Sequence, residues 1–283
     1  MKFPLWLIST NIYISIAAVA LTIETQLQLG LKPEFHPYIS IIFFATLLDY
    51  NLNTLLNLFK RSATTNINKA VLSIQPFFAL IFSSILGLVI SISTASIEVL
   101  YTLLPFVLLT LSYSIPLKVK THKVTLRQIP YLKIFLISIV WSCVTILPPF
   151  VKSNLEFDNT HVSMMVLERF LFVFAITIPF DIRDMKEDAI AGLKTIPIYF
   201  GKKAAAYLSI IAIILFFTIS LFHYLNSHQT PIILAFSISA FITLYLLLDN
   251  KIKQNSMYYY GFLDGAMLMQ GLLVIFFSIP FPN

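Results

Sequence analysis

Long apolar stretches separated by short polar connections dominate this chain. A helix that spans a membrane needs about 20 mostly apolar residues, and nine stretches approach that length. Their apolar residues are continuous rather than alternating, which favours helices over the strands of a barrel. We therefore predict nine transmembrane helices, at residues 5–23, 38–58, 72–94, 97–117, 132–150, 163–182, 203–223, 230–248 and 258–279.

The composition of the chain supports a membrane protein. Hydrophobic residues make up 58% of the chain, charged residues make up 11%, and the mean hydropathy is +0.86. An ordinary soluble domain contains about 25% charged residues. Nine spans with short connections leave no room for a second domain in 283 residues. The sequence predicts a single all-α polytopic membrane domain over residues 1–283, and its one cysteine, Cys143, excludes an internal disulfide.

The distribution of basic residues predicts the orientation. The connections on one side of the predicted bundle carry most of the Lys and Arg residues, in segments 60–69, 118–133, 183–203 and 251–253. The connections on the other side hold Lys32 and Lys152. By the positive-inside rule, the basic side is cytoplasmic. We expect an integral protein of the cell (inner) membrane, with its N-terminus in the cytoplasm and its C-terminus outside. The net charge of +6 then reflects topology and contact with membrane lipids, not nucleic acid.

The end of the sixth span carries the densest negative charge, in the segment PFDIRDMKED. Asp181, Asp184 and Asp188 are spaced i, i+3, i+7 and share one helical face. Carboxylates at a helix C-terminus oppose the macrodipole, and they repel one another unless a cation compensates them. One interpretation is a solvated helix end with Arg183 and Lys186 as partners. We favour a Mg²⁺ site, because Mg²⁺ takes one or two carboxylates plus substrate phosphates.

A related polar face lies at the same end of the second span. Asp49, Asn53 and Asn57 are spaced i, i+4, i+8 there. Asparagines often form hydrogen bonds between membrane helices, and for Asn53 and Asn57 this role and ligand binding are equally open. An intramembrane carboxylate is costly and tends to be functional or paired. We therefore predict Asp49 as a further metal ligand, at a depth similar to that of the aspartates in the sixth span.

Basic residues of the connection between spans four and five lie at this end as well. They are Lys118, Lys120, Lys123, Arg127 and Lys133. A single loop lysine usually determines topology alone, whereas a group beside the aspartates suits an anion. We predict Lys118, Lys120 and Arg127 as ligands of that anion. Near the outer end of span six, we expect Glu168 and Arg169 to pair and to snorkel towards the interface.

These motifs resemble the UbiA superfamily of intramembrane prenyltransferases. The family's second aspartate-rich motif is D-x-x-D-x-x-x-D followed by G-x-x-T-x-P…G. The matching residues are Asp181, Asp184, Asp188, Gly192, Thr195, Pro197 and Gly201. The stretch YSIPLK resembles a Tyr/Pro/Lys stretch of the family. The first motif, usually N-D-x-x-D-x-x-x-D, departs: Asp49, Asn53 and Asn57 stand at its first, fifth and ninth positions, and Tyr50 replaces an aspartate.

The resemblance implies a bundle of nine helices around a cavity open to the membrane, with an active-site cap on the cytoplasmic side. It implies transfer of a prenyl group from a prenyl diphosphate to an aromatic or quinone-precursor acceptor, assisted by Mg²⁺. Asp181, Asp184, Asp188 and Asp49 would hold the metal; Asn53, Asn57, Lys118, Lys120 and Arg127 would bind the diphosphate. No residue is assigned as catalytic, and the acceptor is unknown.

Two other functions stay open. The degenerate first motif is compatible with a silent member that binds an isoprenoid diphosphate without transferring it. The intramembrane carboxylates Asp49 and Asp264 are compatible with a transporter, although the charge lies at one face rather than at the midplane of the membrane.

Overall fold

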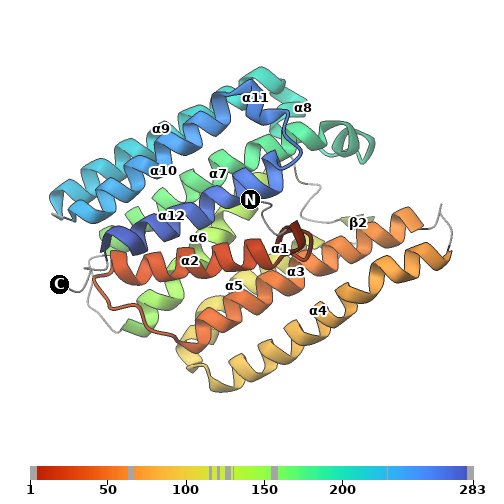
Figure 1. Ribbon diagram of the computed structural model, residues 1–283, viewed down its shortest axis with the longest axis horizontal. Helices are drawn as coiled ribbons and strands as arrows, with labels where there is room; N and C mark the ends of the chain where they lie inside the picture. Colours follow the sequence, from red (N-terminus) through yellow and green to blue (C-terminus); the bar gives the residue numbers. More distant parts are fainter. Residues whose placement is uncertain are drawn as a thin grey trace.

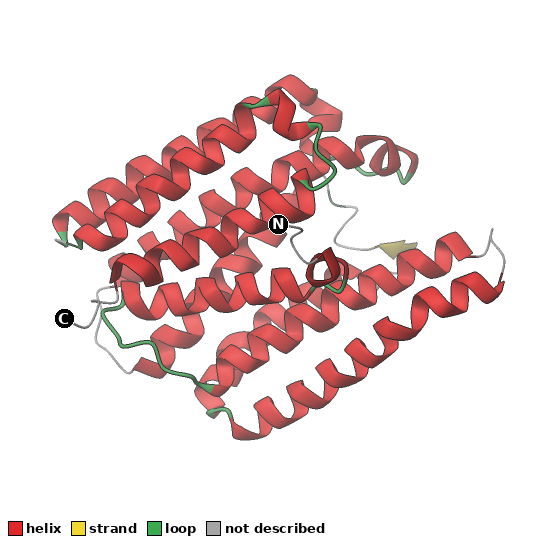
Figure 2. Cartoon of the chain, viewed as in Figure 1, coloured by secondary structure: helices red, strands yellow, loops and turns green. Residues whose placement is uncertain are grey.

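The structure is a computed structural model that describes residues 5–62, 67–114, 117–119, 122–124, 129, 131–153, 159–227 and 229–278. Long helices lie side by side in one bundle (Figure 1), and helices make up nearly all of the described chain (Figure 2). The first half contains α1 (Leu5–Ser9), α2 (Ile12–Gln28), α3 (Pro37–Ser62), α4 (Ile67–Thr94), α5 (Ile97–Ser114), β1 (Leu117–Val119) and β2 (His122–Val124). The second half contains α6 (Leu132–Ser153), α7 (Asn159–Ile190), α8 (Ile196–Phe200), α9 (Lys202–Asn226), α10 (Thr230–Leu248), α11 (Asn250–Lys253), the π-helix η2 (Tyr258–Leu263) and α12 (Asp264–Ser278).

Each of the nine predicted spans is helical over most of its length, although the first is divided between α1 and α2. Not all of these helices are long enough to count as spans. Within the described residues, seven are long and apolar enough to cross a membrane: α3, α4, α6, α7, α9, α10 and η2 with α12. The apolar helix α2 has 17 residues, which at 1.5 Å each extend about 25 Å, short of a hydrocarbon core about 30 Å thick. The apolar part of α5, Ile97–Ser112, is also short. Nine transmembrane helices are therefore not confirmed.

The predicted all-α class is confirmed with one small exception. β1 and β2 form an antiparallel hairpin in the connection between α5 and α6, with Leu117 opposite Val124. Two of the connections rich in Lys and Arg, residues 60–69 and 183–203, are partly helical, because α3 continues to Ser62, α4 begins at Ile67 and α7 continues to Ile190. The functional residues placed in the second of these connections therefore lie on a helix.

The helix α7 is central to the packing. It packs against α6 on one side and α9 on another, and α10 then joins α9 to α12, which lies along α2 (Figure 1). Its residues Phe172, Ala175 and Ile178 are completely buried, in the largest apolar cluster of the protein. The helix α3 belongs to the other part of the bundle, where it packs against α4 and α2.

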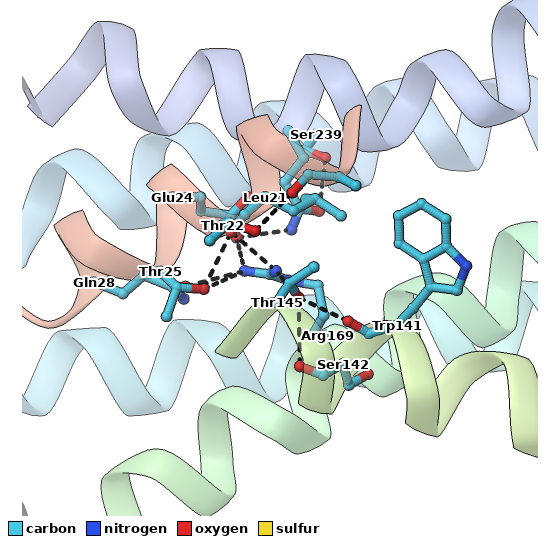
Figure 3. A network of polar contacts seen from close by, with 12 residues as sticks. Leu21, Thr22, Glu24, Thr25, Gln28, Trp141, Ser142, Thr145, Arg169 and Ser239 are labelled. Atoms are coloured by element: carbon cyan, nitrogen blue, oxygen red, sulfur yellow. Dashed lines mark hydrogen bonds and ion pairs between the residues drawn. The ribbon is translucent and has the colours of Figure 1, made fainter. Parts of the chain in front are cut away.

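A buried polar network crosses the middle of the bundle (Figure 3). Arg169 of α7 is 2% exposed, and its Nη2 lies 2.7 Å from Oε1 of Glu24 on α2, which is fully buried. The same guanidinium donates to the Thr145 hydroxyl of α6 at 2.8 Å. Gln270 of α12 donates to Glu24 at 3.1 Å and accepts from Ser239 of α10 at 3.2 Å. An uncompensated charge is costly in such surroundings, so this network fixes five helices relative to one another.

A neighbouring polar chain joins α7 to α9. Glu168 is 1% exposed, and its Oε1 lies 2.7 Å from Nδ1 of His223, whose Nε2 lies 2.8 Å from Nδ1 of His161. Our expectation that Glu168 and Arg169 pair with each other and snorkel is wrong. Each side chain points to a different neighbouring helix, where a partner of suitable charge or polarity is available.

Replacing Arg169 with Met is expected to destabilise the protein by roughly 3–5 kcal/mol, because Glu24 would keep a buried charge without its cation. Thermal unfolding of the purified protein, followed by the loss of helical circular dichroism, measures the change. The double variant Glu24→Gln/Arg169→Met removes both charges and is expected to recover part of the lost melting temperature. Lys186→Met, which removes an exposed cation from the same helix, is the control. Equal melting temperatures for Arg169→Met and this control would contradict the expectation.

Candidate functional site

The three aspartates of the predicted metal site lie near the C-terminal end of α7, which stops at a left-handed glycine. Gly192 has a φ of 71°, its N–H donates to the Ala189 carbonyl at 3.0 Å, and the Leu193 N–H donates to the Asp188 carbonyl at 2.9 Å. This pattern is a Schellman C-cap, which favours glycine because a Cβ disfavours positive φ. The helix therefore extends past Asp188 and presents all three carboxylates from a rigid element.

The connection after α7 also positions the start of α6. The backbone N–H of Tyr131 donates to the Lys194 carbonyl at 2.9 Å. The Tyr131 ring packs against Tyr199 and Phe200 of α8, with centroids 5.6 and 5.9 Å apart. Because α6 begins at the next residue, these contacts hold its first turn beside the aspartate face of α7.

Lys133, in that first turn, supplies the cation that this face requires. Its Nζ lies 2.7 Å from Oδ1 of Asp181 and 3.0 Å from Oδ2 of Asp188. Asp181 and Asp188 are each 1% exposed, so neither carboxylate is well solvated. The second oxygen of Asp181, Oδ2, is buried and has no hydrogen-bond partner among the described residues. The lysine thus compensates two of the three aspartates and leaves one buried oxygen for a further ligand.

Asp184 has a different partner on its own helix. Arg183 donates from Nε and Nη2 to the two carboxylate oxygens of Asp184, at 2.6 and 3.1 Å. The guanidinium also lies 4.8–5.1 Å from the ring centroids of Phe180, Tyr259 and Tyr260, within the range of cation–π attraction. This ion pair is more exposed than the Lys133 cluster, at 29% for Arg183 and 28% for Asp184. The interpretation of a solvated helix end therefore describes Asp184 but not Asp181 or Asp188.

The three carboxylates are not gathered around one point. The described residues contain no group of three or more His, Cys, Asp or Glu side chains that would hold a metal ion. The residue types still fit a single Mg²⁺ shared with a diphosphate, since Mg²⁺ requires one or two protein carboxylates besides phosphate oxygens. Asp181 keeps an unused buried oxygen, and Asp184 follows it by one helical turn. The assignment of a metal to these residues stays a prediction.

The polar face of α3 lies in a different part of the bundle. Asp49 is half-buried, Asn53 is exposed, and the Asn53 amide donates to Asp49 at 3.5 Å, a long hydrogen bond. The side chain of Asn57 lies outside the described residues. The helices α3 and α7 each contact α6, but they are not a closely packed pair themselves. A contact between the two polar faces through a ligand stays a prediction.

The predicted anion ligands Lys118, Lys120 and Arg127 belong to the connection before α6. Lys118 is in β1, where its backbone pairs with that of Lys123, and nothing is described of its side chain. Lys120 and Arg127 lie outside the described residues.

A further asparagine of α3, Asn51, is completely buried and donates to the Leu47 carbonyl at 2.8 Å and to the Thr10 carbonyl at 3.1 Å. Asn51 thus has the packing role that was one of the two interpretations for Asn53 and Asn57.

The helical bundle, with seven helices long and apolar enough to cross a membrane within the described residues, fits an integral membrane protein. The family model of the UbiA prenyltransferase family matches residues 68–265, well over half of the chain. The chain belongs to this family, which confirms the resemblance of its motifs, and its seven apolar helices fit an integral membrane protein. The matched range includes Asp181, Asp184 and Asp188 but begins after α3, whose motif departs from the family pattern.

Two solved structures are similar over almost the entire chain. An apo structure of a UbiA homolog from Aeropyrum pernix K1 is 14% identical, with a TM-score of 0.66, and the match covers 95% of this chain and 98% of that one. A structure from work on digeranylgeranylglyceryl phosphate synthase in membranes is 17% identical, with a TM-score of 0.53 and 96% of each chain covered. Identities this low show a shared fold and no more. No curated protein matches the chain.

Replacing Lys133 with Met is expected to destabilise the protein by about 3 kcal/mol, because the buried Asp181 would lose its cation. Lys133→Arg keeps the positive charge and is expected to retain most of the stability. The melting temperatures of both variants measure these effects. Lys152→Met removes an exposed cation from the other end of the same helix and serves as the matched control. If Lys133→Met had the same melting temperature as the wild type, the ion pairs of Lys133 would not stabilise this helix end.

Proposed function

We propose that this protein is a membrane-embedded prenyltransferase that moves a prenyl group from a prenyl diphosphate to an acceptor with the assistance of Mg²⁺. Membership in the UbiA prenyltransferase family supports the reaction class. The observation that carries the diphosphate site is the buried unused oxygen of Asp181 beside Asp184, at a helix end where Lys133 and Arg183 already pair with the three aspartates. An aromatic or quinone-precursor molecule is the proposed acceptor class.

The residues of this chain take defined parts in the proposed reaction. Asp181 and Asp184 would hold the metal, which neutralises the charge of the leaving diphosphate when bound. Lys133 fixes the orientation of the Asp181 carboxylate, and Arg183 fixes that of Asp184. We propose that Asp188 acts through Lys133, with which it also pairs, rather than as a separate ligand.

The chemical step itself is a substitution at the allylic carbon. The bond between this carbon and the diphosphate oxygen breaks, and its electron pair leaves with the diphosphate. The carbon then bonds to an electron-rich atom of the acceptor, which loses a proton. Lys118, Lys120 and Arg127 are proposed to share the diphosphate charge, which grows as the bond breaks. Asp49, Asn53 and Asn57 are proposed to contact the same ligand from α3.

We propose that the aspartate end of the bundle faces the cytoplasm, as the positive-inside rule predicts for the side rich in Lys and Arg. A cavity open to the membrane would let the apolar prenyl chain remain in a hydrophobic environment while its diphosphate reaches the polar end. We therefore propose that the protein resides in the cell membrane with its N-terminus inside and its C-terminus outside.

The second candidate is a family member that binds a prenyl diphosphate without transferring it. The sequence of α3 supports this alternative, because Tyr50, Asn53 and Asn57 stand where the family's first motif usually carries carboxylates. With fewer carboxylates on α3, a second metal ion would have a weaker site there. Binding and turnover therefore need separate tests.

Binding is tested by melting the purified protein with a panel of prenyl diphosphates in Mg²⁺ or in EDTA. A ligand at about 100 times its Kd adds roughly 2.7 kcal/mol of stability, which raises the melting temperature by several degrees. We expect prenyl diphosphates to raise the melting temperature in the presence of Mg²⁺ but not in EDTA. We expect Asp181→Asn and Asp184→Asn to abolish this rise.

Glu187→Gln is the matched control for binding, because it removes an exposed carboxylate from the same helix end and should leave the rise intact. A rise of equal size in EDTA would contradict the role of Mg²⁺. The absence of any rise, for every chain length in the panel, would contradict the diphosphate site itself.

Turnover is tested by the release of diphosphate from the prenyl donor in the presence of a mixture of membrane-extracted acceptors. A prenyltransferase is expected to release diphosphate in proportion to the prenylated product, and Asp184→Asn should reduce the rate by at least about a hundredfold, as when one stabilising group of a transition state is removed. Mg²⁺-dependent binding without any release would favour the silent binder.

A further inference from the structure

A second polar site lies at the same end of the bundle but on another side of α7. A pocket of about 260 Å³ is formed between α7, α9, α10, α11 and η2. Pro179 and Ile182 of α7 line this pocket, whereas Asp181 lies on a different face of the helix, since successive residues are about 100° apart. In Figure 1 these elements meet at the upper right, near the labels α8 and α11.

Positive charge gathers at this pocket from two separate elements. Lys202 and Lys203 come from the first turn of α9, directly after Gly201, whose φ of 86° turns the chain from α8 into α9. Lys253 comes from α11. The N-terminus of the long helix α9 adds its unsatisfied backbone N–H groups and the positive end of its dipole. Both contributions favour an anion.

No carboxylate of the described residues forms an ion pair with any of these three lysines. Asp249, the nearest acidic residue to Lys253 in sequence, is already engaged. It accepts hydrogen bonds from the backbone N–H groups of Lys251 and Ile252 at 2.6 and 3.1 Å, and these bonds lower the pKa of its carboxyl. The positive charge at the pocket therefore lacks a compensating group from this part of the protein.

A buried donor without a partner points independently to a ligand. Tyr258 lines the pocket and is 2% exposed, and its hydroxyl has no hydrogen-bond partner among the described residues. A buried hydroxyl without a partner costs free energy, so such groups in folded proteins usually find a protein, water or ligand acceptor. An oxygen-rich anion held by the three lysines would supply that acceptor.

The remaining lining specifies more than a bare anion. Ala206, Ile182 and Leu247 line the pocket with apolar surface, and Ala206 lies one helical turn from the lysine pair, towards the middle of α9. Pockets for drug-sized ligands hold about 300–1,000 Å³, so this smaller pocket takes a headgroup and the first part of a chain. Basic pockets between transmembrane helices are known to suit phosphate-bearing lipid headgroups.

We propose that this pocket binds the phosphate group of an anionic amphiphile. Lys202, Lys203 and Lys253 pair with the phosphate oxygens, and the Tyr258 hydroxyl donates to one of them. The carbons next to the phosphate lie against Ala206 and Leu247. The site uses none of the aspartates and goes beyond the proposed prenyl transfer, so neither proposal depends on the other.

The test uses the full-length protein in nanodiscs of phosphatidylcholine, with EDTA present throughout to exclude the metal-dependent site. The melting temperature is compared with and without a minor fraction of phosphatidylglycerol, and separately with inorganic phosphate or a soluble diphosphate. We expect phosphatidylglycerol to raise the melting temperature in a concentration-dependent manner. The variant Lys202→Gln/Lys203→Gln/Lys253→Gln should lose this rise.

Two further variants separate the pocket from general surface charge. The triple variant Lys186→Gln/Lys194→Gln/Lys251→Gln removes the same charge from exposed positions at the same end and should keep the rise. Tyr258→Phe removes one oxygen and is expected to weaken lipid binding about three- to tenfold, the effect of one hydrogen bond. Because this change is small, it tests the site even if the lysine triple variant does not fold.

The outcomes distinguish the possible sources of the phosphate. A rise with phosphatidylglycerol but not with inorganic phosphate, lost in the pocket variants, supports a lipid headgroup. An equal rise with inorganic phosphate or diphosphate, lost in the same variants, supports the phosphate site and assigns it to a soluble anion. Loss of the rise in both lysine triple variants, or its complete retention in Tyr258→Phe, would overturn the proposal. Asp181→Asn should keep the rise, whatever the fate of the prenyltransferase proposal.

Discussion

The ion pair between Arg169 and Glu24 lies in the interior of the bundle, where neither charge has access to water. Membrane helices gain little from apolar contacts alone, because lipid is as apolar as their side chains. Their arrangement therefore depends on packing and on polar groups that must find partners. Here one guanidinium and one carboxylate recruit groups from α2, α6, α7, α12 and, through Gln270, α10 (Figure 3). This network aligns α7, and α7 carries the candidate site.

The same constraint explains the end of α7. Carboxylates on one face of a helix C-terminus repel one another and oppose the helix dipole, so they require cations. Lys133 reaches Asp181 and Asp188 from α6, while Arg183 holds Asp184 and packs on three aromatic rings. Side-chain cations thus provide part of the compensation for which we had favoured a metal ion. A diphosphate with its metal would bind at a helix end where Lys133 and Arg183 already orient the carboxylates.

The helical class, the positions of the helices and the aspartate face could all be predicted from the sequence, because each depends on local patterns of apolar and acidic residues. Most partners of the charged residues could not, although the sequence did suggest Arg183 as a partner of the aspartates. Lys133 stood in the sequence as one of several loop lysines, and Glu24 lay just beyond the first predicted span. Glu168 and Arg169 are adjacent in sequence, yet they point to α9 and α2 respectively, because neighbouring residues on a helix face different directions.

The sequence by itself determined that this is a helical membrane protein with a UbiA-like acidic motif at one end of a helix, because hydropathy and i, i+3, i+7 spacing are properties of short segments. Tertiary structure alone decided which cation meets which carboxylate and which helices pack together. It also decided that Tyr258 of η2, two lysines of α9 and one lysine of α11 line one pocket. Side chains distant in sequence come into contact only when helices pack. In a medium of low dielectric constant, a charged side chain is stable only where such a contact supplies a partner.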